Sequence, residues 1–311
     1  MFPVCKTQER TNKMKYIMDL IKGIFIGIAN IIPGVSGGTM AVSLGIYDRL
    51  ISSITGLLKN VKKSLQTLIP ILLGAAIGIV GFTYAIEFLL SKYTLPTCLT
   101  FVGLILGGIP ILVKHFKAGL DEKQGGKISA ANVIAFVLLF ALVIFMAFQQ
   151  GADNELTTFD VNAGNMIKLF FAGLIASATM VVPGISGSLV LMILGYYYGV
   201  LNTIKNFLDA LKVMDMAGLG HGFMLLLPFG IGVILGIFLI AKAIEYLFKK
   251  HTTITYSAIL GLIIASPVAI FSNTNALADL SSDTAVIRVI AGIVLLIGGA
   301  AITYFLGKKE A

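Results

Sequence analysis

The chain has 311 residues, of which 57% are hydrophobic and only 12% are charged, and its formal net charge at pH 7 is +8. Soluble proteins carry about 25% charged residues, so this composition excludes an ordinary soluble domain and predicts a helical membrane protein. The basic residues stand in short loops between apolar runs, as in membrane topology signals, so we predict no nucleic-acid partner. The two cysteines and three histidines are scattered along the chain, which predicts neither a metal site nor a cofactor.

Several apolar runs are long enough to cross the hydrocarbon core of a bilayer as helices. In chain order, these candidate spans lie at about 66–91, 95–113, 131–149, 222–248, 254–272 and 286–306. Two further apolar segments, about 16–58 and 166–208, are each interrupted by Pro-Gly and by additional glycines. Because proline and glycine break helices, these two segments are predicted to differ from the uninterrupted spans.

The two interrupted segments contain nearly the same phrase. "NIIPGVSGGTM" begins at Asn30, and "MVVPGISGSLV" begins 150 residues later, at Met180. The match resumes with an offset of 158, where "AIEFLLSKYT" of the first half faces "AIEYLFKKHT" of the second. The chain is therefore an internal duplication within one integral membrane domain, a common construction in transporters. The first repeat covers 1–149 and the second covers 150–311.

Basic residues predict how the repeats lie in the membrane, because cytoplasmic loops are enriched in Lys and Arg. Segment 16–58 has basic clusters at both ends, and both can be cytoplasmic only if the segment enters the membrane and returns as a re-entrant hairpin. Segment 166–208 follows "GADNELTTFDVNAGN", which lacks Lys and Arg, so this second hairpin enters from outside. The prediction is an all-α polytopic membrane protein of two inverted-topology repeats, each a re-entrant helical hairpin plus three transmembrane helices, with both termini cytoplasmic.

The repeated phrase has the chemistry of an anion site. Pro33 and Pro183 are predicted to end the first arm of each hairpin, and a helix that begins near Ser36 or Ser186 offers partial positive charge and unpaired N–H groups. Two such tips meeting near the bilayer midplane would suit a phosphate or another anion. The candidate residues are Asn30, Pro33, Gly34, Ser36, Gly37, Gly38, Thr39, Pro183, Gly184, Ser186, Gly187 and Ser188. In the alternative interpretation, these small residues only allow tight helix packing.

Four polar residues leave alternatives open. Glu87 and Glu245 occupy equivalent positions near span ends, where they could couple transport to a proton or another cation, or could pair with a lysine. The lysines within reach are Lys92, Lys242 and Lys249. Arg49 could guide a phosphate or anchor its loop in the cytoplasm. Asn30 could cap a helix or contact the ligand.

The two phrases also carry a family resemblance. "NIIPGVSGGTMAVSLGIYDRLI" and "VVPGISGSLVLMILGYYYGVL" resemble the DUF368 family of bacterial membrane proteins, and the resemblance covers nearly the whole chain. It implies a translocase that returns undecaprenyl phosphate, the lipid carrier for peptidoglycan and other envelope polymers, from the outer to the inner leaflet of the cytoplasmic membrane. It also implies that the Pro-Gly-x-Ser-Gly residues of both phrases shape the substrate site. Where the first phrase has Gly38-Thr39 the second has Ser188-Leu189, so the two tips need not contribute equally.

Two other functions compete with this prediction. A channel or exchanger for small anions would also use the N-termini of broken helices. Undecaprenyl-pyrophosphate phosphatases carry a similar Pro-Gly-x-Ser phrase, but Gly37 or Gly187 stands here where those enzymes have an arginine, and no paired glutamates follow. We therefore predict a transporter and not an enzyme. Its predicted partners are polyprenyl phosphate, membrane lipids and a coupling proton or other cation. The sequence is also compatible with an oligomer.

Overall fold

The computed structural model describes residues 3–32, 34–149, 159–281 and 284–308, and within these ranges the chain is helical, with no strand. The first half contains α1 (Pro3–Ile31), α2 (Gly37–Ser43), α3 (Tyr47–Thr55), α4 (Val61–Lys92), α5 (Thr94–Leu106), α6 (Ile109–Gln124) and α7 (Ala130–Phe148). The second half contains α8 (Ala163–Val181), α9 (Gly187–Ile193), α10 (Tyr197–Val213), α11 (Met216–Lys250), α12 (Thr252–Ser272) and α13 (Ala285–Lys308). This confirms the all-α prediction.

Within the described ranges, seven helical stretches are long and apolar enough to cross a membrane. They are α4, α5 with most of α6, α7, α8, α11, α12 and α13. The α9–α10 pair passes the same test as a unit but bends by 110° at its break, as a re-entrant segment would. The chain is therefore a polytopic membrane protein, as predicted. α8 was predicted as one arm of a hairpin, but its length would also allow a complete crossing.

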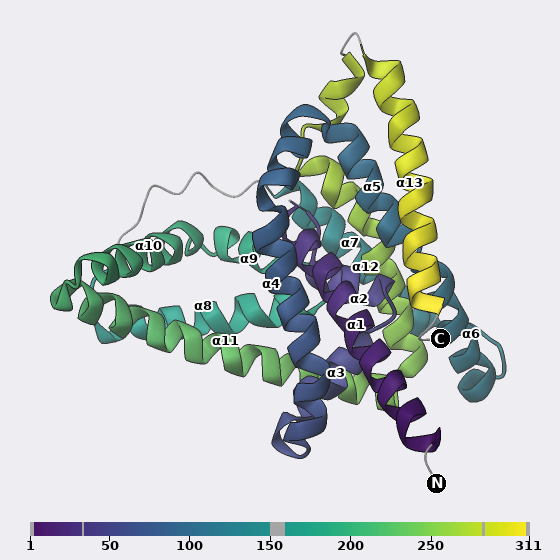
Figure 1. Ribbon diagram of the computed structural model, residues 1–311, viewed down its shortest axis with the longest axis horizontal. Coiled ribbons are helices and arrows are strands. Elements are labelled where there is room, and N and C mark those ends of the chain that lie inside the picture. The colour runs from purple at the N-terminus through teal and green to yellow at the C-terminus, as the bar shows by residue number, and fades with distance from the viewer. Residues whose placement is uncertain (1–2, 33, 150–158, 282–283, 309–311) are drawn as a thin grey trace.

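The packing of the helices repeats in the two halves. α1 packs along α4, and their counterparts α8 and α11 pack along each other (Figure 1). Each contact depends on a glycine, because a Cβ on Gly74 would lie 2.1 Å from the Leu20 carbonyl oxygen and one on Gly232 would lie 2.1 Å from that of Phe170. These residues are related by the same offsets as the sequence repeat. The duplication thus extends to helix packing, while the opposite orientation of the two halves stays a prediction.

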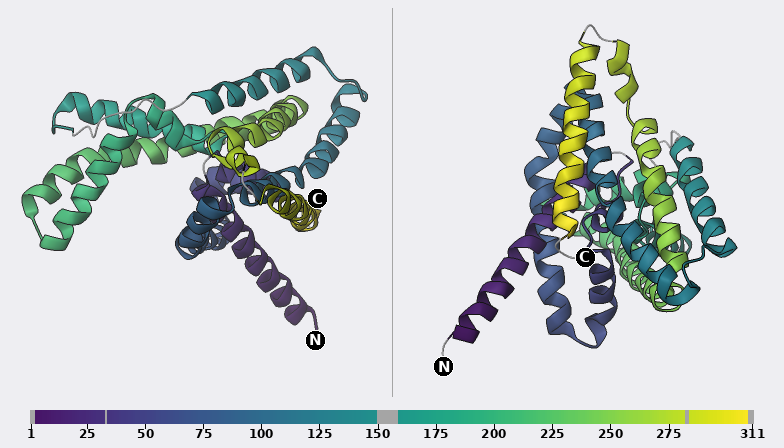
Figure 2. Two further views of the ribbon diagram at one scale, coloured as in Figure 1. Left: turned by 90° about the horizontal axis from the view of Figure 1, so that it is seen from above. Right: turned by 90° about the vertical axis from the view of Figure 1, so that its right-hand side faces the viewer.

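The short helices α2 and α9 lie near the centre of the molecule. α8, α10 and α11 extend together away from this centre, on the left of Figure 1 and again in the view from above in Figure 2. The core around α2 combines residues of α1, α2, α5 and α12, including the fully buried Ala29, Met40, Leu44, Ile105 and Ile263. The two Pro-Gly breaks are therefore positioned inside the helix assembly, where non-helical backbone is shielded from lipid.

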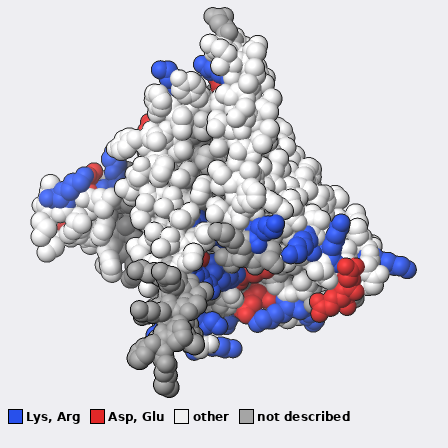
Figure 3. Space-filling view, turned by 45° about the vertical axis from the view of Figure 1, so that its right-hand side comes forward, with Lys and Arg blue, Asp and Glu red and all other residues white. Residues whose placement is uncertain are grey.

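The surface is divided by charge. Figure 3 shows a broad face without charged side chains, with Lys, Arg, Asp and Glu gathered mainly along its lower edge and a few basic side chains at its opposite end. A wide uncharged surface between charged margins is what a membrane-embedded protein presents to lipid.

Candidate substrate cavity at the two hairpin tips

The repeated phrase forms the same helix break in both halves. Gly34 and Gly184 adopt φ angles of +81° and +80°, a left-handed conformation that costs other residues about 1–2 kcal/mol. Pro183 is buried at the second break, and Pro33 lies outside the described residues. The breaks are followed by seven-residue helices, α2 and α9, in equivalent positions. Over the described residues, the two phrases therefore share the left-handed glycine and the short helix that follows it.

The first tip is capped by its own side chains. The Gly38 N–H donates to the Ser36 hydroxyl oxygen at 3.2 Å, and the Gly37 N–H donates to the Asn30 side-chain oxygen at 3.1 Å. The Asn30 amide nitrogen in turn donates to the Ile26 carbonyl at 3.0 Å. These bonds satisfy N–H groups that open a helix N-terminus. The sequence predicted unpaired N–H groups at both tips; at the first tip these two are paired within the chain, and Asn30 is a helix cap.

The second tip is more open. Ser186 begins α9 but makes no side-chain capping bond. Its hydroxyl lies 2.8 Å from that of Ser188, and this pair is exposed. Ser36, in contrast, is buried. The two tips therefore share a backbone but differ in which hydroxyls a ligand can reach.

The tips touch each other directly. The Gly184 N–H donates to the Thr39 hydroxyl oxygen at 2.6 Å, and the Tyr47 hydroxyl donates to the Val181 carbonyl at 3.0 Å. A Cβ on Gly38 would lie 3.1 Å from that same Val181 oxygen. Thr39 and Tyr47 of the first half thus form hydrogen bonds to the backbone of the second half, and Gly38 allows the close approach.

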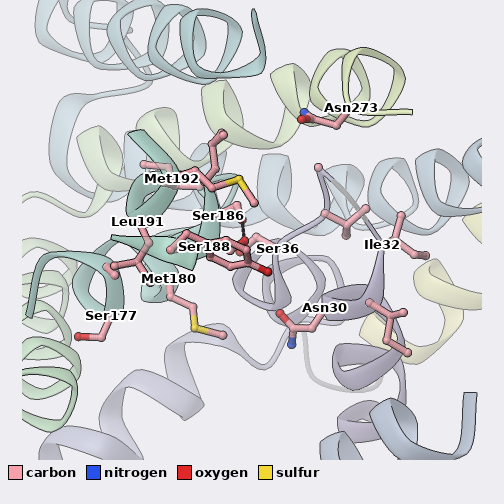
Figure 4. A pocket seen from close by; sticks show the side chains of 18 of the residues that line it. Asn30, Ile32, Ser36, Ser177, Met180, Ser186, Ser188, Leu191, Met192 and Asn273 are labelled. Atoms are coloured by element: carbon pink, nitrogen blue, oxygen red, sulfur yellow. Dashed lines mark hydrogen bonds between the residues drawn. The ribbon is translucent and has the colours of Figure 1, made fainter. Parts of the chain in front are cut away.

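A cavity of about 600 Å³ opens where the tips meet. Figure 4 shows Ser36, Ser186 and Ser188 close together, with Asn30 and Asn273 on either side of them. Among the predicted residues, Asn30, Gly34, Ser36, Ser186, Gly187 and Ser188 line the cavity. Its walls carry hydroxyls, amides and apolar groups, and no charged side chain is among its lining residues. Such a lining can donate hydrogen bonds to an anion and still tolerate apolar chain segments.

The structure adds cavity residues that the sequence prediction missed. Ser177, Tyr197 and Asn273 line the cavity with hydroxyl and amide groups, and Met180 and Met192 contribute flexible apolar surface. Tyr197 had one signal in the sequence, since it is identical to Tyr47 of the first phrase. The others had none, because α8 and α12 come to the cavity only through folding.

Several predicted residues lie away from the cavity wall. Gly38, Thr39, Pro183 and Gly184 are at the contact between the two tips, and Gly37 lies against the Asn30 side chain. Arg49 forms an ion pair with the buried Asp19 of α1 and is not a lining residue.

The two glutamates are also outside the cavity. Glu87 is exposed on α4, and Glu245 pairs with Lys249 at 2.5 Å on α11. Lys242, the other predicted partner of Glu245, lies over the Phe238 ring instead, 4.7 Å from its centroid. The pairing alternative therefore describes Glu245 better than a cavity role does.

Lys22 occupies an unexpected position. It is one of the basic residues near the start of the first interrupted segment, yet it is fully buried and its ammonium donates to the Leu44 carbonyl at 3.1 Å. Leu44 ends α2, so the cation complements the negative end of that helix. Lys22 thus contacts the first hairpin from within the helix assembly and does not lie on the surface.

Comparison with known proteins gives a consistent picture. The chain matches a family described as VCA0040-like, undecaprenyl phosphate translocase-like, over residues 26–287. It is 30% identical to a polyprenyl-phosphate transporter of Staphylococcus aureus over 94% of this chain and 97% of the relative. It is 27% identical to a polyprenyl-phosphate transporter of Vibrio cholerae over 81% of this chain and 77% of the relative. No solved structure matches.

The family description and both relatives' names indicate a transporter and not an enzyme, in agreement with the prediction from the sequence. The family match spans most of the chain and includes both Pro-Gly phrases. The chain therefore belongs to the VCA0040-like, undecaprenyl phosphate translocase-like family.

Proposed function

We propose that this protein moves polyprenyl phosphate, of the undecaprenyl phosphate type, from the outer to the inner leaflet of the bacterial cytoplasmic membrane, where the lipid carrier is reused. The observation that carries the proposal is the cavity between the two hairpin tips, lined by hydroxyls and amides from both halves of the chain. The names of the family and of both relatives support the substrate class.

The size and lining of the cavity fit a lipid phosphate whose tail stays outside. A charged headgroup cannot cross hydrocarbon without a cost of several kcal/mol or more. A cavity of about 600 Å³ has room for the phosphate and the first part of the chain but not for a long polyprenyl tail. We therefore expect the headgroup to bind inside while the tail remains among the membrane lipids.

The hydroxyls are the proposed phosphate ligands. Ser186 and Ser188 present theirs to the cavity, and Ser36 lines it from the opposite tip. Asn30 can contribute its amide from the same wall. Thr39 has a different role in this proposal, because its hydroxyl oxygen accepts the Gly184 N–H and holds the tips together.

The inverted arrangement of the two repeats belongs to the same proposal. With both termini in the cytoplasm, a lipid phosphate in the outer leaflet would reach the second hairpin, and one in the inner leaflet would reach the first. The central site would then be accessible from each leaflet in turn. Inward movement of an anion opposes an inside-negative potential by about 2.3 kcal/mol per charge per 100 mV. A coupled proton or other cation would offset that cost, and Glu87 and Glu245 are the residues that the sequence nominates for it.

The decisive experiment is transport by the purified protein in liposomes. Undecaprenyl phosphate is placed in one leaflet, and its arrival in the other is followed with and without protein. The Ser36→Ala, Ser186→Ala double variant should lose roughly tenfold or more in transport, as expected when hydrogen bonds to a charged group are lost. Ser91→Ala is the matched control, because Ser91 is exposed on α4 and bonds only the Phe88 carbonyl.

Three outcomes would contradict the proposal. Chloride flux without lipid phosphate movement would favour an anion channel or exchanger. Release of inorganic phosphate from a pyrophosphate lipid would favour a phosphatase. Unchanged transport in the double serine variant would remove the hydroxyls from the site.

A further inference from the structure

A second, much smaller cavity lies beside the first hairpin. It measures about 30 Å³ and is lined by Tyr47 and Asp48 of α3, His115 of α6 and Tyr256 of α12. That volume holds about one water molecule and excludes a lipid phosphate. The polar groups around it are unlike those of the large cavity, because they include a carboxyl and an imidazole.

Three of the polar side chains of this cavity contact one another. The Tyr256 hydroxyl donates to Asp48 Oδ2 at 2.8 Å. The His115 ring stacks on the Tyr256 ring, with centroids 5.6 Å apart and planes inclined by 18°. Tyr256 is buried, whereas Asp48 keeps an exposed side through which protons can arrive. The bond joins α12 to the start of α3 and so closes this part of the molecule.

The small cavity is the repeat counterpart of the large one. Val42 and Tyr47 line the small cavity, and the residues 150 positions later, Met192 and Tyr197, line the large one. His115 lines the small cavity, and the residue 158 positions later is the large-cavity residue Asn273. The same part of each hairpin thus borders a cavity, open at the second hairpin and nearly closed at the first.

The acidic group of the small cavity has no acidic counterpart at the large one. Asp48 is matched by Tyr198, and Tyr256 is matched by Cys98. The buried ion pair behind Asp48, between Arg49 and Asp19, is matched by Gly199 and Leu169. At these positions the charged side chains Asp19, Asp48 and Arg49 all belong to the first half. Packing alone would not require this difference between the repeats, which points to a function for these charges in the first half.

We propose that Asp48, Tyr256 and His115 form a proton-binding site that couples the opening of the first hairpin to pH. This rests on the proposed transport function and assigns its coupling to groups other than Glu87 and Glu245. An ionised Asp48 accepts the Tyr256 hydroxyl and holds α3 against α12; binding of a proton from water to a carboxylate oxygen removes the charge that makes this bond strong.

A proton suits the site better than a metal ion. Among the described residues, no group of three His, Cys, Asp or Glu side chains is arranged to hold a metal. The Asp48 carboxylate instead accepts one hydrogen bond from Tyr256, and a single proton from water can neutralise it without any further ligand.

Other charged groups on the surrounding helices belong to the same electrostatic environment. They are Asp19 and Lys22 on α1, Arg49 on α3, Lys62 and Lys63 on α4, Lys114 and Lys117 on α6, and Glu245 and Lys249 on α11. Asp19 with Arg49 and Glu245 with Lys249 are ion pairs, so their charges are largely compensated locally.

The first test measures protonation itself and needs no substrate. Infrared difference spectra of the purified protein between about pH 3 and about pH 8, which bracket the ordinary carboxyl and imidazole range, should show a protonated-carboxyl band that Asp48→Asn removes. Asp121→Asn, at the end of α6, should leave the band in place. Tyr256→Phe should move its midpoint to higher pH, because the ionised carboxylate loses a donor. A band unchanged in Asp48→Asn would overturn the assignment.

The second test uses transport in liposomes. The wild-type rate should change severalfold with the pH on the side of the first hairpin, and Asp48→Asn should lose this response while still moving lipid phosphate. Glu87→Gln and Glu245→Gln should keep the pH response. The proposal would be overturned if these two variants lost the response and Asp48→Asn kept it. Response to sodium replacement instead of pH would also overturn it. If the wild type moves no lipid phosphate, the proposed function fails, whereas the infrared result still decides whether Asp48 binds a proton.

Discussion

At the scale of single residues, the same serine has different tasks in the two halves. Ser36 accepts the Gly38 N–H and so caps α2, whereas Ser186 makes no capping bond and pairs with Ser188. Capping contributes to folding stability, whereas the exposed hydroxyl pair is a proposed phosphate ligand. The two serines are therefore equivalent in the sequence repeat but not in energetics.

Variants of one tip at a time should separate these tasks. Ser36→Ala should lower folding stability by about 0.5–2 kcal/mol, because a helix cap is lost. Ser186→Ala combined with Ser188→Ala should leave the unfolding temperature nearly unchanged and weaken substrate binding by roughly tenfold or more, because donors to a phosphate are lost. Thermal unfolding in detergent and transport in liposomes provide the two readouts. Equal effects of both changes on stability would contradict this division.

Thr39 offers a test of the contact between the tips. Thr39→Val keeps the shape of the side chain but leaves the Gly184 N–H without its acceptor, which should cost about 1–3 kcal/mol of stability. Thr83→Val is the matched control, since the Thr83 hydroxyl donates to the Ile79 carbonyl within its own helix, α4, and does not join the two tips. A control variant as destabilised as Thr39→Val would show that the contact between the tips adds nothing.

At the scale of elements, each hairpin depends on a glycine that turns the chain between two helices. Gly34 and Gly184 share the same left-handed backbone, but their surroundings differ. A Cβ on Gly34 would lie 2.5 Å from the Ala269 carbonyl oxygen, whereas a Cβ on Gly184 would lie 3.2 Å from the Leu262 carbonyl oxygen. The first break is therefore packed more tightly against α12 than the second.

Alanine at the two breaks should reveal this difference. Gly184→Ala should destabilise the protein by about 1–2 kcal/mol from backbone strain alone. Gly34→Ala should cost more, because backbone atoms of α12 must also move. Gly81→Ala in α4 meets open space and should stabilise by about 0.5–1 kcal/mol, the helix preference for alanine over glycine. Equal unfolding temperatures for the two break variants would refute the expected order.

At the scale of the whole molecule, the matched packing of α1 with α4 and of α8 with α11 agrees with a duplicated architecture. The orientation of the two halves in the bilayer follows from the distribution of Lys and Arg and stays a prediction. Lys59 and Lys250 are predicted inside, and Asp160 is predicted outside.

Cysteine labelling would test this topology. After Cys5 and Cys98 are changed to serine, Asp160→Cys should react with a membrane-impermeant maleimide in intact cells. Lys59→Cys and Lys250→Cys should react only after the membrane is made permeable. Reaction of all three from the same side would rule out the inverted arrangement.

The sequence predicted the two breaks well because their signals are local. Pro-Gly-x-Ser-Gly interrupts an apolar run wherever it occurs, and Gly34 and Gly184 indeed adopt the backbone that only glycine adopts easily. Asn273 and Ser177 could not be predicted, since nothing near them in the sequence marks a cavity. The buried position of Lys22 could not be predicted either, because nothing in the sequence distinguishes it from the lysines around it.

By itself, the sequence determined the membrane class, the helical spans, the duplication and the resemblance to a family, because hydropathy, helix breakers and repeats are properties of short stretches of chain. Only the tertiary structure decided that the two tips touch, that the first is capped while the second is open, and that Asp48 meets Tyr256 from 208 residues away. Each of these features depends on side chains that are far apart in the sequence and meet only in the folded protein. The energy of such a contact depends on both residues, and the sequence around one of them does not identify the other.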